Sequence, residues 1–380
     1  IKVIPSRLSV VTKRINNDRG VCFYCNGCAR SCNVYADFSS GSCLIFPAQN
    51  AGGQIDLFVN SMVRTVETNA EGKATGVSYI NKDDGIEYKL RGKVVVLAAS
   101  ACSSARILLN SKSKQHPNGL GNSSDLVGKY LHDSTGGDMM AFLPQLTNRK
   151  TYNEDGVGGM HVYSPWWLDN KSLDFPRGYH IEVWGGMGAP SYGTGFNVNH
   201  FNKFFGLKAG GYGDILRSDM KKYYGSTIGF SGRGESVAMK SNYCEIDPDK
   251  VDKYGVPVLR FNYKWTDYEI KQAKHMQDTF EEIIHNMGGQ SLWNKPGIES
   301  NYGLTKPGEI IHEVGTTRMG NNPKDSVVDK FERMHDVDNV FIVDAGPFVS
   351  QADKNPTWTI MALAWRASDH IVSEFKKQNF

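Results

Sequence analysis

Alternating apolar and polar positions between residues 55 and 99 predict a series of short strands. The expected strands cover residues 55–60, 63–68, 75–81 and 86–90, and the turns between them contain the Gly and Asp residues typical of hairpins. The segment 93–99 is instead apolar at every position after Lys93, which is typical of a strand buried on both faces of a parallel sheet. The pattern therefore predicts a β-meander that leads into a parallel sheet.

Helical periodicity marks three further segments. The small residues 100–104 open a helix that runs to Leu109, and a strand followed by such a turn lets a ligand approach backbone amides. Apolar positions at helical spacing predict helices over residues 267–287 and 356–375, and residues 340–343 form another short buried strand. The predicted fold class is therefore α/β or α+β.

The sequence pattern changes between residues 133 and 308, where Gly-rich and aromatic loops alternate with strand-like segments such as residues 180–184. We interpret 133–308 as an inserted, mostly antiparallel β domain that binds substrate. Residues 1–132 and 309–380 would then be two portions of one cofactor-binding domain. No G-x-G-x-x-G fingerprint lies between a strand and a helix, so we expect the N-terminal Rossmann βαβ unit to be missing from this chain.

Composition narrows the classes of partner. The 380 residues are 40% hydrophobic and 22% charged, and the net charge of +3 comes without the basic runs that bind nucleic acid. The longest apolar stretch, residues 94–99, is far shorter than the roughly 20 residues of a membrane-spanning helix. We expect a small-molecule substrate, no nucleic acid and no membrane span.

Four of the seven cysteines, Cys22, Cys25, Cys28 and Cys32, form a C-x2-C-x2-C-x3-C run. Thiols this dense pair poorly as disulfides, whereas the spacing suits a loop that wraps a metal cluster. A [3Fe–4S] or [4Fe–4S] iron–sulfur cluster is the favoured interpretation. Zinc, and a turn with free or disulfide-bonded cysteines, are the alternatives.

Two C-terminal segments carry further candidate chemistry. Residues 311–320 place His312 in a Gly- and Thr-rich turn, and residues 343–347 are followed by Asn355-Pro356-Thr357. A loop histidine is commonly satisfied by its neighbours, and Asn before Pro is a frequent helix opening in which Asn caps the first amides. Taken singly, neither residue has to be catalytic.

Together with the strings at residues 95–101, 104–109 and 119–122, these motifs resemble the glucose–methanol–choline (GMC) oxidoreductase family, in the family's order. The resemblance covers essentially the whole chain and implies an FAD enzyme that oxidises an alcohol or sugar hydroxyl. It implies that His312 is the general base and that Asn355 is its hydrogen-bonding partner at the substrate. A neutral imidazole suits this task because it titrates near neutral pH.

The resemblance also implies contacts with the cofactor. Val63 would meet the adenine and Ala99 would lie near the same cofactor, while Asp344 and Ala345 would touch the ribityl and pyrophosphate region. Pro356 and Thr357 would open a C-terminal helix whose N-terminus points at the flavin, where the helix dipole stabilises negative charge.

The cysteine run resembles that of bacterial sugar dehydrogenases that pass electrons from the flavin through an iron–sulfur centre. It implies a sugar or glucoside dehydrogenase with a cytochrome or quinone acceptor, and a cytochrome c or a small accessory subunit as partner. The bacterial periplasm is the expected location, and the cytoplasm is the alternative. A GMC oxidase that uses oxygen without a relay, and a non-catalytic subunit that retains the fold, stay open. The aromatic residues that would suit stacking on sugar rings are Trp166, Trp167, His180, Trp184 and Tyr192.

Overall fold

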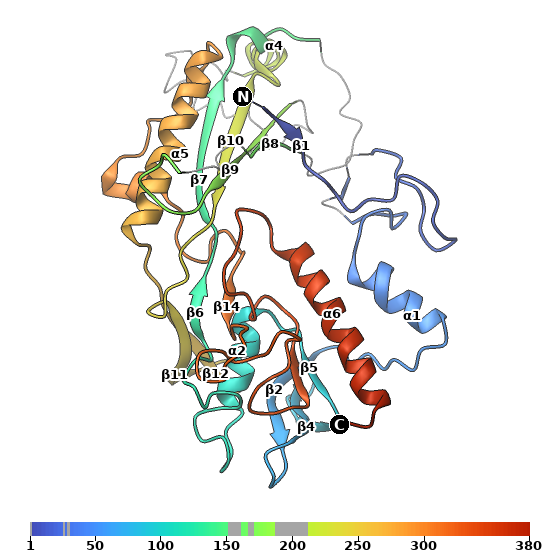
Figure 1. Cartoon of the computed structure of the whole chain (residues 1–380). Helices are drawn as coiled ribbons and strands as arrows, with labels where there is room; N and C mark the ends of the chain where they lie inside the picture. The colour runs from blue at the N-terminus through green and yellow to red at the C-terminus, as the bar shows by residue number, and fades with distance from the viewer. Residues whose placement is uncertain (1, 26, 29–30, 151–160, 166–170, 187–211) are drawn as a thin grey trace.

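The computed structural model describes residues 2–25, 27–28, 31–150, 161–165, 171–186 and 212–380. Figure 1 shows a large sheet with helices α4 and α5 in the upper half, and smaller sheets with helices α2 and α6 in the lower half. The first strand, β1, lies in the upper sheet, and the last helix, α6, lies in the lower half.

The upper sheet has six strands in the order β1-β8-β9-β10-β7-β13, and every pair in it is antiparallel. Its strands are β1 (Ile4–Pro5), β8 (Val162–Ser164), β9 (Tyr179–Gly185), β10 (Thr227–Gly234), β7 (Thr135–Phe142) and β13 (Gln290–Ser291). The antiparallel pairing of β7, β8, β9, β10 and β13 confirms the mostly antiparallel character predicted for residues 133–308, whereas β1 comes from the N-terminal part of the chain.

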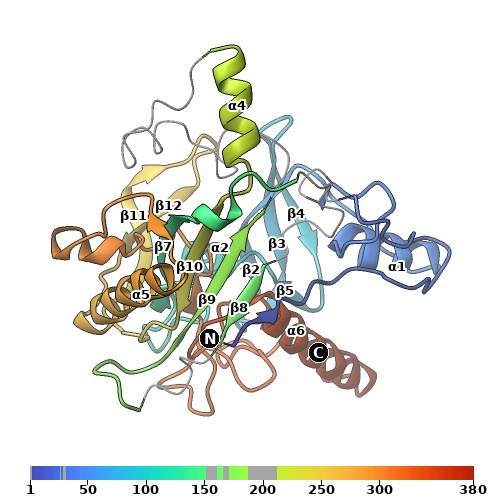
Figure 2. The ribbon, with the colours of Figure 1, turned by 90° about the horizontal axis from the view of Figure 1, so that it is seen from above.

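Helix α5 (Asp267–Asn286) covers one face of that sheet (Figure 2). It begins with a capping box. The side chain of Thr266 accepts a hydrogen bond from the backbone of the first turn, and the carboxylate of Glu269 accepts one from the backbone amide of Thr266. Met276 and Phe280 of the helix pack with Ile181 and Phe230 of the sheet. Helix α5 covers only this face, so the opposite face of the sheet is available for contacts with other parts of the molecule.

The lower half holds three smaller sheets. A four-stranded sheet has the order β12-β11-β6-β14, a meander has the order β2-β3-β4, and β15 pairs with β5 in parallel. The strands are β12 (Pro257–Asn262), β11 (Tyr243–Val251), β6 (Lys129–His132), β14 (Val314–Thr316), β2 (Ser61–Thr68), β3 (Ala74–Asn81), β4 (Glu87–Arg91), β15 (Val340–Ile342) and β5 (Val95–Leu97). The predicted meander and parallel pair are confirmed.

Two details of that prediction are wrong. Residues 55–60 form no strand and are exposed, because the alternation there is not matched by a neighbouring strand. Strand β5 is buried on one face only: Val95 and Leu97 are buried, whereas 46% of Val96 is exposed. A continuous apolar run therefore marks the strand correctly without showing that both faces are covered.

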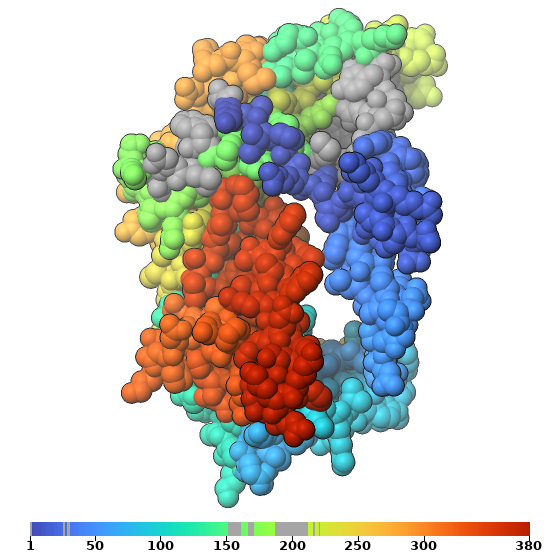
Figure 3. All heavy atoms as spheres, turned by 45° about the vertical axis from the view of Figure 1, so that its right-hand side comes forward, coloured from blue at the N-terminus to red at the C-terminus, as the bar shows by residue number. Residues whose placement is uncertain are grey.

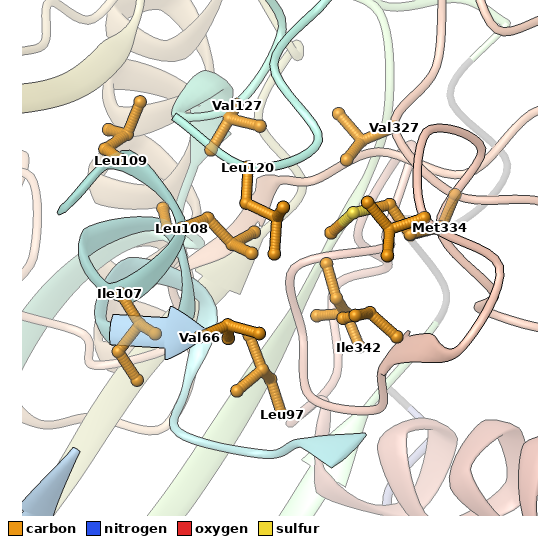
Figure 4. Packing of buried hydrophobic residues seen from close by; sticks show 14 of the residues in the cluster. Val66, Leu97, Ile107, Leu108, Leu109, Leu120, Val127, Val327, Met334 and Ile342 are labelled. Carbon is orange, nitrogen blue, oxygen red and sulfur yellow. The ribbon is translucent and has the colours of Figure 1, made fainter. Parts of the chain in front are cut away.

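The lower core joins segments that are distant in sequence. Val66 of β2, Leu97 of β5, Leu108 of helix α2 (Ala101–Asn110), Met334 and Ile342 belong to one buried cluster, which Figure 4 shows at close range. Burial of each such side chain contributes about 1.5–3 kcal/mol. This packing holds the carboxyl ends of β5 and β15 against α2.

The last helix, α6 (Thr357–Lys376), lies beside the lower sheets, close to the predicted bounds of 356–375. Figure 3 shows the surface hollowed between α6 and the segment around α1 (Phe46–Asn50). The remaining helical elements are η2 (Gly41–Ile45), η3 (Pro144–Leu146), α4 (Asp214–Tyr223) and η5 (Ile298–Gly303). Among the described helices, none combines the length and apolar character needed to span a bilayer.

Candidate active site

The backbone around His312 is held by a buried carboxylate. Asp133 lies in the link between β6 and β7, and its Oδ1 accepts hydrogen bonds from the amides of His312 (3.0 Å) and Ser134 (2.7 Å). Its Oδ2 accepts from the amide of Gly308 at 3.0 Å. Burial, together with the charge of Glu313, raises the pKa of Asp133 to about 6. One carboxylate thus fixes the loop that carries His312.

The imidazole of His312 lies between two polar partners. Asn355 Nδ2 is 3.1 Å from His312 Nε2, and Ser134 Oγ is 3.2 Å from His312 Nδ1. A carboxamide nitrogen can only donate, so Nε2 accepts and the ring proton stays on Nδ1. Gln351 Nε2 donates to Ser134 Oγ at 3.0 Å, which leaves that oxygen's other lone pair for the Nδ1 proton. The structure thus brings His312 and Asn355 into contact, and their roles as base and substrate partner stay predictions.

Charged groups on the upper sheet change the pKa of this imidazole. Burial is the main cause that lowers the pKa of His312; Arg233 and His180 lower it further, while Glu182 raises it. A histidine with a lowered pKa stays neutral at pH values where an exposed one begins to protonate. The ring is therefore able to accept a proton near neutral pH.

A chain of polar contacts continues from the Asn355 loop into the sheet. His180 Nδ1 is 3.2 Å from Asp353 Oδ2, and His180 Nε2 is 3.4 Å from Glu182 Oε1. Burial opposes ionisation of Glu182, yet the hydrogen bond from His180 and the charge of His161 hold its pKa below the usual value. The face of β9 opposite α5 therefore presents an ionised carboxylate toward the imidazole.

Asn355 does not cap α6. The residue before the helix is Pro356, no side chain caps the first amides, and the carboxamide turns to His312 instead. The helix opening predicted from Asn-Pro is right in position and wrong in its capping partner. The first amides of α6 thus have no side-chain cap, and they lie directly after the residue that bonds the imidazole.

The carboxyl ends of β5 and β15 form the second part of the site. Asp344, which follows β15, accepts a 2.5 Å hydrogen bond from Ser104 Oγ of α2 and a 2.8 Å bond from the amide of Gly346. Burial raises the pKa of Asp344. Ligands of open parallel sheets bind at this edge, outside the carboxyl ends of the strands.

Observations at this edge fit a bound flavin nucleotide. The amides of Gly315 and Thr317 donate to the carbonyls of Ala345 and Gly346, both at 3.1 Å, which joins the His312 segment to the Asp344 turn. The hydroxyl of Thr317 is buried without a partner among the described residues, and a Cβ on Gly346 would lie only 2.2 Å from it. An unsatisfied buried hydroxyl beside bare backbone is what a polar ligand would complete.

The other residues predicted to contact the cofactor lie on several different segments of the fold. Ala99 follows β5 at the strand's carboxyl end, and Ala345 is buried next to Asp344. Pro356 and Thr357 stand at the start of α6, directly after Asn355. Val63 lies on β2, where it packs against the lower core. Their contacts with a cofactor stay predictions.

The four cysteines do not gather. Within the described part of the chain, no group of three or more His, Cys, Asp or Glu side chains is placed to hold a metal ion. Cys22 Sγ accepts from the amide of Tyr24 at 3.4 Å and Cys32 Sγ accepts from the amide of Ala36 at 3.3 Å, so local turns orient these thiols. The structure does not fit the predicted iron–sulfur cluster, and we derive no step through it.

Sequence reasoning missed Asp133, Ser134 and Gln351. The only signal for them was their position beside predicted boundaries, since Asp133 begins the predicted inserted domain and Gln351 precedes the Asn355 motif. Of the aromatic residues considered for sugar binding, His180 and Trp184 lie on β9. Trp166, Trp167 and Tyr192 lie outside the described residues.

Sequence profiles of the GMC oxidoreductase family match the chain twice, the N-terminal profile over residues 6–135 and the C-terminal profile over residues 240–364. The chain therefore belongs to the GMC oxidoreductase family, which binds FAD. The expectation that the family's N-terminal unit is missing is wrong, because the N-terminal profile matches here. A glycine fingerprint is one short segment, so its absence says little about the rest of a domain.

Three relatives illustrate the range of the family. The chain is 32% identical over 323 residues to a 2-methyl-1,2-propanediol dehydrogenase of Mycolicibacterium austroafricanum, covering 84% of this chain and 55% of the relative. It is 26% identical to the fructose dehydrogenase large subunit of Gluconobacter japonicus, covering 93% of this chain and 60% of the relative. It is 25% identical to a C-glycoside 3-oxidase of Arthrobacter globiformis, covering 84% of this chain and 54% of the relative.

Solved structures agree on the fold. A formate oxidase of Aspergillus oryzae superposes with a TM-score of 0.58 at 14% identity, covering 83% of this chain and 60% of that one. A pyridoxine 4-oxidase from Mesorbium loti gives a TM-score of 0.55 at 15% identity, covering 82% and 57%. The chain thus spans little more than half the length of the relatives it matches.

Proposed function

We propose that this chain oxidises an alcohol or sugar hydroxyl at the site formed by His312 and Asn355. The observation that carries the proposal is the 3.1 Å contact between Asn355 Nδ2 and His312 Nε2, which leaves Nε2 without a proton of its own. A non-catalytic subunit would have no need of a neutral imidazole held by two hydrogen-bonding partners. FAD, when bound, would accept the hydride from the carbinol carbon.

The proton of the hydroxyl would go to His312. A substrate hydroxyl would replace the Asn355 amide as the hydrogen-bond donor to Nε2, and Nε2 would then take its proton. Asn355 Nδ2 would turn to the hydroxyl oxygen, which it can hold as a donor without competing for the proton. Ser134 and Gln351 keep the ring's other proton on Nδ1 throughout.

The edge at β5 and β15 would hold the cofactor. Ala99, Asp344 and Ala345 stand at the carboxyl ends of these strands, and the uncapped amides at Thr357 begin the helix that follows Asn355. Oriented amides favour negative charge, which suits the reduced state of a flavin. Val63 would meet the cofactor from β2.

A sugar or glucoside dehydrogenase is the activity we favour, because two of the relatives are named dehydrogenases and one of them acts on fructose by its name. The electron acceptor would then be a cytochrome or a quinone. The name "large subunit" supports a small accessory subunit as partner. We keep 1–132, 133–308 and 309–380 as the proposed division into cofactor and substrate portions, and the bacterial periplasm as the proposed location.

Anaerobic mixing of the FAD-loaded protein with methyl glucoside and with simple alcohols tests the function. We expect the flavin's visible absorbance to bleach. Because the pKa of His312 is lowered, we expect the bleaching rate to fall on the acid side only below the ordinary histidine value of about 6.5. A flavin that no alcohol or sugar reduces would refute the proposal. Reoxidation by oxygen with peroxide release would assign an oxidase instead.

Iron analysis of the purified protein tests the relay. The C-x2-C-x2-C-x3-C spacing alone supports a cluster and predicts at least three iron atoms per chain. The placement of the thiols predicts less than one, which is the value we expect. Three or four iron atoms per chain that are lost in Cys25→Ser would support an iron–sulfur relay after all. They would also show that this loop rearranges around metal.

A further inference from the structure

The segment that carries Asn355 is hydrogen-bonded to the rest of the described molecule through side chains alone. Among the described residues, no backbone–backbone hydrogen bond involves residues 349–355, which lead into α6. Three of its side chains form hydrogen bonds outside the segment: Gln351 with Ser134, Asp353 with His180, and Asn355 with His312. The position of the Asn355 carboxamide therefore depends on a few side-chain contacts.

His180 is the anchor of this segment on the upper sheet. It lies on β9, which pairs with β8 and β10, and only 2% of it is exposed. Its neighbours Tyr179 and Ile181 are fully buried in the upper core. Its Nδ1 lies 3.2 Å from Asp353 Oδ2, and its Nε2 lies 3.4 Å from Glu182 Oε1. Carboxylates at both ring nitrogens thus orient an imidazole whose backbone is already fixed.

A second contact ties the same segment to β8. Lys354 Nζ lies 5.1 Å from the centre of the Tyr163 ring and also bonds Asp353. The rings of Tyr163 and His180 meet edge to face, with their centres 5.7 Å apart. Burial opposes ionisation of Asp353, yet hydrogen bonds from His180 and Lys354 hold its pKa below the usual value. Asp353 is therefore a buried, ionised acceptor, which is costly to leave without its donors.

We propose that His180 is a positioning residue that holds Asp353, and through it the carboxamide of Asn355, at His312. The inference rests on the proposed function and adds to it the residue that sets the geometry of the proposed catalytic pair. Asn355 follows Asp353 by only two residues, so a shift of the Asp353 carboxylate displaces the carboxamide. Displacement of a reacting group by about 1 Å can lower a rate about 100-fold.

The test measures the rate constant of anaerobic flavin reduction by saturating methyl glucoside in the FAD-loaded protein. We expect it to fall about tenfold in His180→Ala, which releases the Asn355 segment from the sheet. In the Asn355→Ala background, His180→Ala should cause no further loss, because the carboxamide that it positions is gone. His180→Asn keeps a nitrogen donor for Asp353 and should restore most of the rate.

His275→Ala is the matched control. His275 is a half-buried imidazole on α5 that lies 2.7 Å from the hydroxyl of Tyr179, on the other face of β9, so its loss disturbs the strand without touching the Asn355 segment. This variant should reduce flavin like the wild type. An unchanged rate in His180→Ala would overturn the proposal. An equal loss with and without Asn355 would overturn it too, because it would show a role independent of that carboxamide.

Nitrogen NMR separates failure of this inference from failure of the proposed function. The Nε2 resonance of His312, identified by its absence in His312→Ala, reports the hydrogen bond from Asn355 without any turnover. We expect His180→Ala to shift it to the position that it has in Asn355→Ala, and His275→Ala to leave it in place. If no hydroxyl compound reduces the flavin, the function fails, and an unshifted resonance in His180→Ala would still refute the positioning role. Should His180→Ala not fold, Asp353→Ala breaks the same hydrogen bond and must give the same shift.

Discussion

Replacing His312 with alanine is expected to lower kcat by about 10²–10⁴-fold, the usual contribution of a positioned general base. The substitution removes the acceptor Nε2 that faces Asn355 and leaves no other described group bonded to that carboxamide to take the proton. Flavin content should not change, because the edge at β5 and β15 is built from other residues. Turnover and bound flavin are measured on the same preparation.

His285→Ala is the matched control, since His285 is exposed near the end of α5. It should turn over like the wild type. Added imidazole should restore part of the activity of His312→Ala, because a free base can enter the space that the side chain leaves. A variant with normal kcat would eliminate His312 as the base.

Replacing Asp133 with alanine should lower the free energy of unfolding by about 2–4 kcal/mol, because buried backbone amides lose a charged acceptor. Three amides are affected, those of Ser134, Gly308 and His312. The His312 loop loses its anchor as well, so kcat should fall with stability. Urea unfolding and turnover measure the two effects.

Asp249→Ala serves as the control for this substitution, since that carboxyl is exposed on β11 and should change stability by no more than about 0.5 kcal/mol. The pKa of Asp133 is raised to about 6, above its value in the unfolded chain. The wild type therefore carries a stabilising contribution that is complete below about pH 4 and is lost as the pH rises through about 6. Asp133→Ala should lack that component. Equal stability of Asp133→Ala and the wild type would refute the anchoring role.

The local elements could be predicted from sequence where a pattern reports directly on burial. Helices α5 and α6 follow their apolar spacing within one or two residues, and β5 and β15 follow their short apolar runs. Residues 55–60 failed because alternation does not show whether a partner strand exists. Pairing of β1 with β8 could not be predicted either, since two residues hold no periodicity.

The site could be predicted only where motifs stand in a known order. His312 and Asn355 were found through their motifs, although 43 positions separate them. Asp133 is 179 positions from His312, and no spacing rule links a buried carboxylate to amides so far along the chain. The cysteine run shows the opposite error: its spacing is specific, whereas the backbone around Cys22 and Cys32 turns the thiols to nearby amides.

The proposed oxidation depends on His312 and Asn355 acting together on one hydroxyl group. A double-mutant cycle on the rate of anaerobic flavin reduction measures this directly, using His312→Ala, Asn355→Ala and the double variant with saturating methyl glucoside. We predict that the double variant reduces flavin about as slowly as His312→Ala alone, because Asn355 has no proton transfer left to support. Losses that simply multiply would show two independent residues and would contradict the account.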